Sequence, residues 1–167
     1  MTNFAFLDSP LGRLVAVADG DAVLRIHFAG QKYSPPIRSS WRENSACAPL
    51  RETIRQLREY FAGARREFTV PLAPEGTPFQ REVWKALLSV RYGQTLAYSE
   101  LAQRAGHPGC ARAAGAANGR NPIAIVIPCH RIIGADGSLT GYAGGLERKR
   151  ALLELEAGRS QLGLALG

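Results

Sequence analysis

Asn-Pro-Ile-Ala-Ile-Val-Ile-Pro-Cys-His-Arg, residues 121–131, is the stretch around which the rest of the chain is arranged. Residues 123–127 are all apolar and rich in Ile and Val, a composition that predicts a short buried strand. Pro128 cannot donate a backbone hydrogen bond, so the strand is expected to end there. Cys129 would then lie where a rigid buried element ends and the chain turns.

Cys129 has two interpretations at this position. In the first it is an inert core residue beside a surface His-Arg pair, as most buried cysteines are. In the second it is a nucleophile, because the adjacent His130 and Arg131 can carry positive charge, which lowers the pKa of a thiol and favours the thiolate. Other parts of the sequence are needed to choose between these two interpretations of Cys129.

The composition is that of a soluble globular protein with a basic surface. The chain has 167 residues, of which 46% are hydrophobic and 21% charged, enough for one ordinary domain or two small ones. Lys and Arg outnumber Asp and Glu by 21 to 14, which is compatible with a polyanionic partner without establishing one. The sequence contains neither a membrane-spanning run nor a signal-peptide pattern. Three cysteines without CxxC spacing favour a reducing compartment, the cytoplasm, over a disulfide framework or zinc finger.

The N-terminal part predicts a small antiparallel sheet. Short apolar runs are separated by turns rich in Asp, Gly and Pro, a pattern typical of a strand meander. The expected strands are residues 3–8, 12–18 and 22–28. Residues 30–46 include two consecutive prolines and scattered charges, and they predict a long surface loop.

A helix and a linker are expected next. Leu50, Ile54, Leu57 and Phe61 recur at spacings of four, three and four, which places them on one face of a helix that ends near Gly63. A further strand is expected at residues 68–70. Residues 71–76 then predict a linker, so we place a domain boundary after residue 76.

The C-terminal part is predicted to be mainly helical. Thr77 and Gln80 have the spacing of a capping box, and Pro78 suits the first helical turn. Ser99 is expected to cap the next helix. One expected helix starts at Thr77-Pro78 and stops before Tyr92, and the others are residues 99–105, 109–119 and 146–157. No element is assigned to the tail from residue 159. Two short helices joined by a glycine-containing turn predict a helix-turn-helix.

The predicted fold class is therefore α+β with two domains. Residues 1–76 would form the small sheet-and-helix domain with its linker. Residues 77–167 would form the mainly helical domain, which carries the helix-turn-helix and the short strand before Cys129.

The second helix of the helix-turn-helix is unusual in its small side chains. Residues 111–119 are mostly Ala and Gly, and Arg112 is the long side chain among them. One interpretation is a helix packed tightly against its neighbours. The other is a helix that approaches DNA closely and inserts one side chain, as in proteins that bind the minor groove. Reading base edges in the major groove needs more polar side chains than this helix offers.

Pro-Cys-His-Arg at 128–131 is preceded by Asn-Pro-Ile and followed by Gly-Tyr-Ala-Gly-Gly-Leu at 141–146. This combination resembles the active-site signature of the O6-alkylguanine-DNA alkyltransferases, and the resemblance is dense over residues 77–156. It implies direct-reversal DNA repair, in which Cys129 takes the alkyl group from O6-alkylguanine in a single irreversible turnover, with O4-alkylthymine as a further candidate substrate.

The resemblance also implies catalytic roles. His130 would act as the base through a bridging water, Glu156 would orient and charge His130, and Tyr98 would protonate or hydrogen-bond the departing guanine. Glu156 is expected in the last turn of its helix, where a carboxylate opposes the helix dipole and costs a few tenths of a kcal/mol if it is merely exposed. That position favours a functional role, although simple surface placement stays open.

Contacts with DNA and with the flipped base follow from the same resemblance. Arg112 would fill the hole left by the flipped nucleotide, and Tyr98 would assist the rotation, which costs a few kcal/mol. The Ala143 amide would lie near the guanine oxygen, and the carbonyls of Cys129 and Ile132 would accept from the exocyclic amine. The expected DNA-binding residues are Tyr98, Ala111, Arg112, Gly115 and Asn118. The expected pocket residues are Pro128, Asn121, Ile132, Tyr142, Ala143 and Gly144.

No cofactor or metal is expected, since the N-terminal part holds only Cys47 and His27 where some family members bind zinc. The expected partner is alkylated double-stranded DNA and not a membrane, bound by a monomer whose copies could cooperate on DNA. Three other functions stay open. A damage-recognition protein would bind lesions without transfer, a helix-turn-helix regulator would prefer one undamaged sequence, and a cysteine hydrolase would release product over many turnovers.

Overall fold

The N-terminal sheet has the three predicted strands and one more. The computed structural model describes residues 1–159, so the last part of the C-terminal tail, residues 160–167, lies outside the described residues. The strands are β1 (Thr2–Ser9), β2 (Gly12–Asp19), β3 (Ala22–Phe28) and β4 (Arg42–Glu43), in the order β3-β2-β1-β4. The first three form an antiparallel meander, as predicted. The short β4 pairs in parallel with β1 inside the segment that was predicted to be entirely loop.

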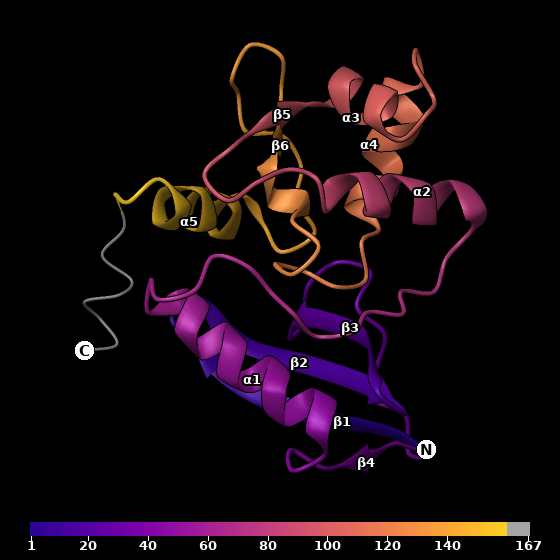
Figure 1. Ribbon diagram of the computed structural model, residues 1–167, viewed down its shortest axis with the longest axis vertical. Coiled ribbons are helices and arrows are strands. Elements are labelled where there is room, and N and C mark those ends of the chain that lie inside the picture. The colour runs from indigo at the N-terminus through magenta and orange to yellow at the C-terminus, as the bar shows by residue number, and fades with distance from the viewer. Residues whose placement is uncertain (160–167) are drawn as a thin grey trace.

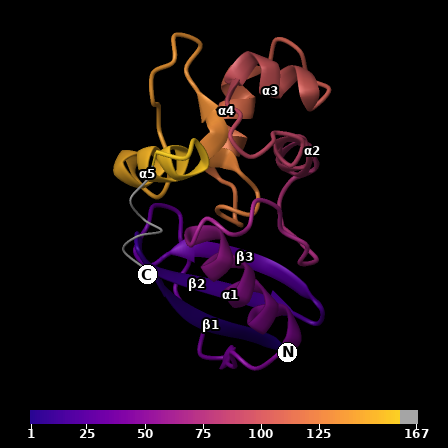
Figure 2. The same ribbon diagram turned by 60° about the vertical axis from the view of Figure 1, so that its left-hand side comes forward.

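Helix α1 (Ala48–Phe61) covers one face of this sheet, as Figures 1 and 2 show. The predicted apolar stripe is correct, because Leu50, Leu57 and Phe61 are completely or almost completely buried against the strands. Burying a side chain of this size stabilises the fold by about 1.5–3 kcal/mol. Tyr60, outside the predicted stripe, is fully buried as well.

The free edge of β3 joins the sheet to the C-terminal half. Ile26 exchanges backbone hydrogen bonds with Pro122 (2.9 Å) and Ala124 (2.8 Å), and Val23 does so with Pro71 and Ala73 (both 2.9 Å). The strand predicted at residues 68–70 is wrong: the pairing occurs at the linker instead and stops after a single bridge. A proline precedes each bridge and cannot donate, which helps to explain why neither segment extends into a ladder.

The C-terminal half contains the four predicted helices. They are α2 (Pro78–Leu87), α3 (Tyr98–Arg104), α4 (Ala111–Gly119) and α5 (Leu146–Glu156), and the two-residue strands β5 (Leu96–Ala97) and β6 (Ile132–Ile133) pair in parallel. The capping box of α2 is confirmed, with Gln80 N donating to Thr77 Oγ1 and Thr77 N donating to Gln80 Oε1. The cap predicted for α3 is wrong, because Tyr98 already lies in the helix and Ala97 is the N-cap.

The predicted fold class is confirmed, but the active-site strand is not where it was expected. Residues 123–127 are buried as predicted, yet they form tight turns, with Ile125 at φ 71° and Ile127 N donating to Ile123 O. A positive φ is rare for a β-branched residue. The side chain of Asn121 stabilises the turns by donating to Ile127 O at 2.7 Å and accepting from Ile123 N at 3.0 Å. An apolar run therefore indicated burial without indicating backbone conformation.

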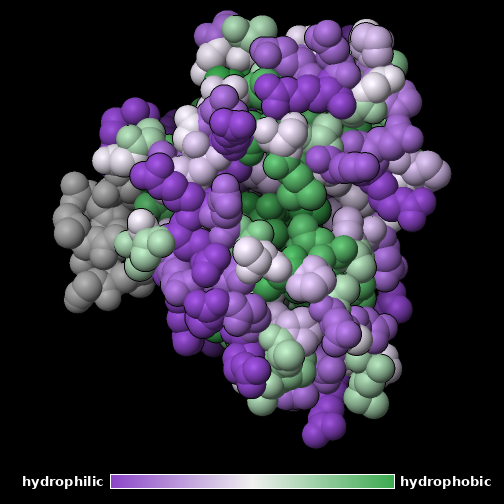
Figure 3. Space-filling view, in the orientation of Figure 1, coloured by the Kyte–Doolittle hydropathy of each residue, from purple (hydrophilic) through white to green (hydrophobic). Residues whose placement is uncertain are grey.

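One hydrophobic core runs from the sheet and α1 into the helical half. A second, smaller cluster lies on the other face of the sheet, formed by Phe4, Val15 and Val17. Figure 3 shows an apolar hollow in the middle of the visible face, rimmed by hydrophilic residues. No helix in the described part of the chain is long and apolar enough to cross a bilayer.

Candidate active site

Cys129 begins a single turn of 3-10 helix, η1 (Cys129–Arg131), directly after the buried turns. Its exposed fraction is 6%, and it borders a small cavity of about 10 Å³. A cavity of that size holds about one water. The side chains and backbone around it include Asn118, Asn121, Ala124, Tyr142, Ala143 and Gly144.

A much larger groove of about 880 Å³ lies outside this small cavity. One wall is α4, whose Ala and Gly residues leave space beside the helix, and another is Tyr98 at the start of α3. The groove and the small cavity share Gly119, Gly141, Tyr142 and Ala143. A molecule in the groove therefore reaches Cys129 past the segment 141–143.

The electrostatics of Cys129 differ from the prediction. Burial raises the pKa of its thiol to about 11, although a hydrogen bond from Asn121 and the nearby Lys149 ammonium act in the opposite direction. The expected lowering by His130 and Arg131 is wrong, because both side chains interact with Glu156 instead. At neutral pH the thiol is protonated, so a reaction at sulfur needs a base to accept its proton.

His130, Arg131 and Glu156 form a buried cluster. His130 Nε2 lies 2.7 Å from Glu156 Oε2, and Arg131 donates from Nε to Oε1 at 2.7 Å and from Nη2 to Oε2 at 3.0 Å. Arg131 Nη1 also donates to Val90 O at 2.7 Å. The interpretation of His130 and Arg131 as a surface pair is thus excluded, and the close approach expected between His130 and Glu156 is present.

The protonation states follow from this arrangement. Burial lowers the pKa of His130, with Glu156 opposing that shift. Burial disfavours the Glu156 carboxylate, but His130 and Arg131 outweigh that effect and hold its pKa well below the usual range. Glu156 is therefore ionised and balanced mainly by Arg131, while His130 is neutral. Its Nδ1 is buried without a hydrogen-bond partner among the described residues, so it is free to accept a proton.

Lys149 is a site residue that the sequence reasoning missed. It has no exposed surface, and its Nζ donates to Ile132 O at 2.5 Å and Thr140 O at 3.0 Å. Burial lowers its pKa to about 8, with Cys129 opposing the shift. In the sequence it is flanked by Arg148 and Arg150, a pattern more typical of a solvated helix face than of a buried ammonium group.

Several predicted residues come together around the groove and the small cavity. The hydroxyl of Tyr98 hydrogen-bonds to Thr140, and its ring lies against Gly115, where an added Cβ would be only 3.2 Å from the ring. Tyr142 lies over Gly144, where a Cβ would come within 2.7 Å of the tyrosine ring. A side chain at position 144 would force Tyr142 to move, and one at position 115 would press against the ring of Tyr98.

Other predicted positions lie away from the surface of the groove. Asn118 is buried and donates to Cys129 O at 3.3 Å, so in this structure its side chain is part of the cysteine site. Pro128 lines a groove that does not include Cys129, and Ile132 is not among the residues lining either cavity described above. The carbonyl oxygens of Cys129 and Ile132 already accept hydrogen bonds from protein donors.

The helix-turn-helix formed by α3 and α4 presents an accessible surface. Arg112 is exposed in the first turn of α4, next to the half-buried Ala111. Arg120 follows the helix and lies over the ring of Tyr33, 3.7 Å from its centroid. These cations give this side of the molecule positive charge.

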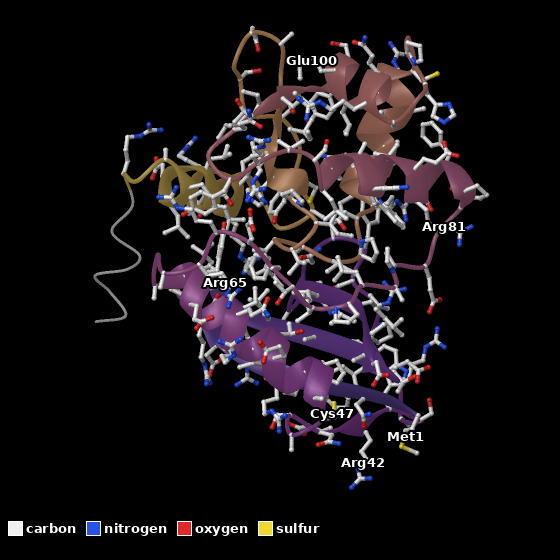
Figure 4. The ribbon with its side chains drawn as sticks, viewed as in Figure 1. Met1, Arg42, Cys47, Arg65, Arg81 and Glu100 are labelled. Carbon is white, nitrogen blue, oxygen red and sulfur yellow. The ribbon has the colours of Figure 1, made fainter. Side chains whose placement is uncertain are left out.

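Residues 1–159 contain no group of three or more His, Cys, Asp and Glu residues arranged to hold a metal ion. Figure 4 shows Cys47 beside the sheet, at the opposite end of the molecule from Glu100 on α3. The half-buried Cys47, the exposed Cys110 and Cys129 are all free.

The fold and the site together define a helix-turn-helix protein that shields a cysteine beside a buried His–Glu pair. Two family models match the chain: the 6-O-methylguanine DNA methyltransferase ribonuclease-like domain over residues 3–74, and the DNA binding domain of the same name over residues 78–158. The chain belongs to the 6-O-methylguanine DNA methyltransferase family.

Similar proteins agree over the full length. A methylated-DNA–protein-cysteine methyltransferase of Mycobacterium tuberculosis is 48% identical over 166 residues, which cover 99% of each chain. One from Methanosarcina acetivorans is 48% identical over 153 residues, covering 92% of this chain and 97% of that protein. The crystal structure of the M. tuberculosis OGT in complex with DNA has a TM-score of 0.88 at 47% identity, with 98% of both chains covered.

Proposed function

We propose that this protein repairs alkylated DNA by moving the alkyl group of O6-alkylguanine onto Cys129. The observation that carries the proposal is the position of Cys129, which is shielded from solvent behind a groove walled by the helix-turn-helix. It is followed directly in the chain by His130, whose Nε2 lies 2.7 Å from Glu156 Oε2. Membership of the methyltransferase family and the likeness to a DNA-bound relative support it.

The chemistry follows from the protonation states. His130 accepts the thiol proton at Nδ1, through a water, while the thiolate attacks the alkyl carbon. A carbon–sulfur bond forms as the carbon–O6 bond breaks, and the electron pair leaves with the guanine. Tyr98 donates a hydrogen bond to the departing base and so stabilises its negative charge. The product is a thioether, and since no group in the site reverses that bond, each molecule acts once.

Access to Cys129 defines how DNA must bind. The cavity at Cys129 holds about one water and is too small for a purine, so the segment 141–144 must move when the base enters. To reach this buried position the target nucleotide must leave the duplex. Tyr142 then stacks on the base, Ala143 lies at the guanine oxygen, and Asn121 holds the turns beneath. Arg112, with Ala111 and Gly115 beside it, enters the minor groove and occupies the vacated position.

Residues 77–167 would thus supply both the DNA-binding surface and the alkyl acceptor, and residues 1–76 the supporting domain. The partner is alkylated double-stranded DNA, and O4-alkylthymine is a candidate second substrate. We further propose that the protein acts as a monomer in the cytoplasm and without a cofactor.

Replacing Arg112 with alanine is expected to slow repair of duplex DNA by about 10- to 100-fold, which corresponds to the few kcal/mol needed to hold a base unpaired. The side chain is exposed, so the free energy of unfolding should stay within about 0.5 kcal/mol of the wild type. Single-turnover transfer rates on lesion-containing duplexes measure the effect.

The matched control is Arg42→Ala, which removes an exposed arginine on β4 at the far end of the molecule (Figure 4). It should leave the repair rate unchanged. Equal rates for the Arg112 variant and the wild type would remove the role assigned to this side chain.

The direct test of the function is titration of an O6-methylguanine duplex with the protein. We expect the lesion to disappear in a one-to-one ratio with protein, because the acceptor is consumed. Lesion binding without loss of methyl groups would indicate a recognition protein instead. Product formed over many turnovers would indicate a hydrolase, and strong preference for one undamaged sequence would indicate a regulator.

A further inference from the structure

The N-terminal helix α1 reaches the cluster that contains His130. Tyr60, in the last turn of α1, has no exposed surface, and its hydroxyl donates to Glu156 Oε2 at 2.6 Å. Residues 60 and 156 are 96 positions apart in the chain. Phenylalanine would fill the same space, so the hydroxyl contributes this hydrogen bond and little else to the packing.

The position of that hydroxyl is fixed by the aromatic rings around it. Phe61 and Tyr92 meet the Tyr60 ring edge-on, with centroids 5.4 and 6.2 Å away, and Phe68 lies 5.6 Å away at a tilt of 40°. A ring held on several sides has little freedom to turn its hydroxyl elsewhere. The donor to Glu156 is therefore preorganised.

Tyr60 and His130 contact the same carboxylate oxygen. Glu156 Oε2 receives the Tyr60 hydroxyl at 2.6 Å, His130 Nε2 at 2.7 Å and Arg131 Nη2 at 3.0 Å. Each donor withdraws negative charge from this oxygen and so weakens its attraction for a proton on the imidazole. Besides burial, the hydrogen bonds that Glu156 receives therefore influence how basic His130 is.

We propose that Tyr60 is a positioning residue for alkyl transfer, whose hydroxyl holds the Glu156 carboxylate in place and limits its pull on His130. The effect keeps His130 neutral and able to accept the thiol proton of Cys129. It gives α1 a part in the chemistry of a site whose Cys129, His130 and Glu156 all come from the C-terminal half. This inference rests on the proposed function, in which His130 is the base.

The charges near His130 come from several elements. Arg131 lies on η1, and Glu156 and Lys149 lie on α5. Tyr92 precedes β5, and the Arg66 guanidinium lies 5.2 Å from its ring centroid. Burial lowers the pKa of His130 most, Glu156 raises it, and Arg131 and Lys149 lower it further. Weakening the hydrogen bonds to Glu156 shifts this balance toward a higher His130 pKa.

The test is Tyr60→Phe, studied in the full chain. Loss of the hydroxyl concentrates negative charge on Glu156, which stabilises the imidazolium and raises the pKa of His130. The acid limb of the transfer rate against pH should move upward by about one pH unit, which is about a tenfold lower rate on that limb. The pKa of His130, read by NMR without DNA, should move the same way.

Tyr92→Phe is the matched control. It removes a phenol that packs against Tyr60 and whose hydroxyl donates to Leu155 O at 3.5 Å, with no hydrogen bond to Glu156. Its pH profile should superimpose on that of the wild type. A merely structural role for Tyr60 predicts lower stability with an unshifted profile, and that result would overturn the proposal.

A second measurement covers the case in which Tyr60→Phe does not fold. Placing 3-fluorotyrosine at position 60 keeps the shape and strengthens the phenol as a donor, so the acid limb should move to lower pH. A shift upward, or none, would contradict the proposal. Wild-type protein that transfers no methyl group would instead contradict the proposed function, so the two failures are distinguishable.

Discussion

Cys129→Ser is expected to bind alkylated DNA as the wild type does and to transfer no measurable alkyl group. Serine is close in size to cysteine, and the residue is buried at the small cavity behind the groove, so binding should persist. A serine hydroxyl is a far weaker acid and a harder nucleophile than a thiol. Removing a covalent nucleophile commonly costs at least about 10³-fold in rate.

Single-turnover assays with an O6-methylguanine duplex, together with binding measurements on the same DNA, check this prediction. Cys47→Ser is the matched control, since Cys47 is half-buried beside the sheet and its Sγ donates to Asn44 O at 3.4 Å. It should transfer at the wild-type rate. Measurable transfer by Cys129→Ser, or loss of transfer in Cys47→Ser, would show that the acceptor is wrongly assigned.

Glu156→Gln is expected to lower the free energy of unfolding by about 3–5 kcal/mol. Arg131 is buried, and a neutral amide leaves its charge without the carboxylate that now accepts two of its hydrogen bonds. For a chain of this length the melting temperature should fall by roughly 10 °C. Transfer should slow as well, because His130 loses the group that orients it.

The pH dependence of this loss has a definite sign. The pKa of Glu156 is held below its usual range in the folded protein, so its contribution is fully present above the ordinary carboxyl pKa. It is lost as the pH falls toward the folded value. The stability difference between the wild type and Glu156→Gln should therefore be largest near neutral pH and shrink in acid.

Urea unfolding at several pH values measures both effects. Glu154→Gln is the matched control on the same helix, half-buried and outside the His130 cluster. It should change stability by no more than about 0.5 kcal/mol. A Glu156→Gln protein as stable as the wild type at neutral pH would mean that Arg131 does not depend on this carboxylate.

Local patterns predicted much of the fold. The strand meander, the apolar stripe of α1, the capping box at Thr77 and the helix-turn-helix are each encoded within a few residues, by periodicity or by turn chemistry. The turns at residues 123–127 were not predictable this way. Their conformation depends on Asn121, which replaces a strand partner by bonding to the backbone on both sides of the turn.

The site was predictable where residues adjoin in sequence or carry a family signature, as with His130 next to Cys129. The pKa values and charge pairs of the site were not predictable, because they depend on burial and on contacts between residues distant in sequence. The sequence cannot show that Arg131 turns inward to Glu156, that Lys149 is buried, or that Tyr60 donates across 96 positions. Burial also raises the pKa of the Cys129 thiol, whereas His130 and Arg131 were expected to lower it.

Locating the transferred methyl group tests the central claim most directly. The protein is incubated with excess O6-methylguanine duplex, digested, and its peptides are weighed by mass spectrometry. We expect one added methyl group per chain, confined to the peptide that contains Cys129, with Cys47 and Cys110 unmodified. An unmodified Cys129 in protein that has removed the lesion, or a methyl group on any other residue, would contradict the account.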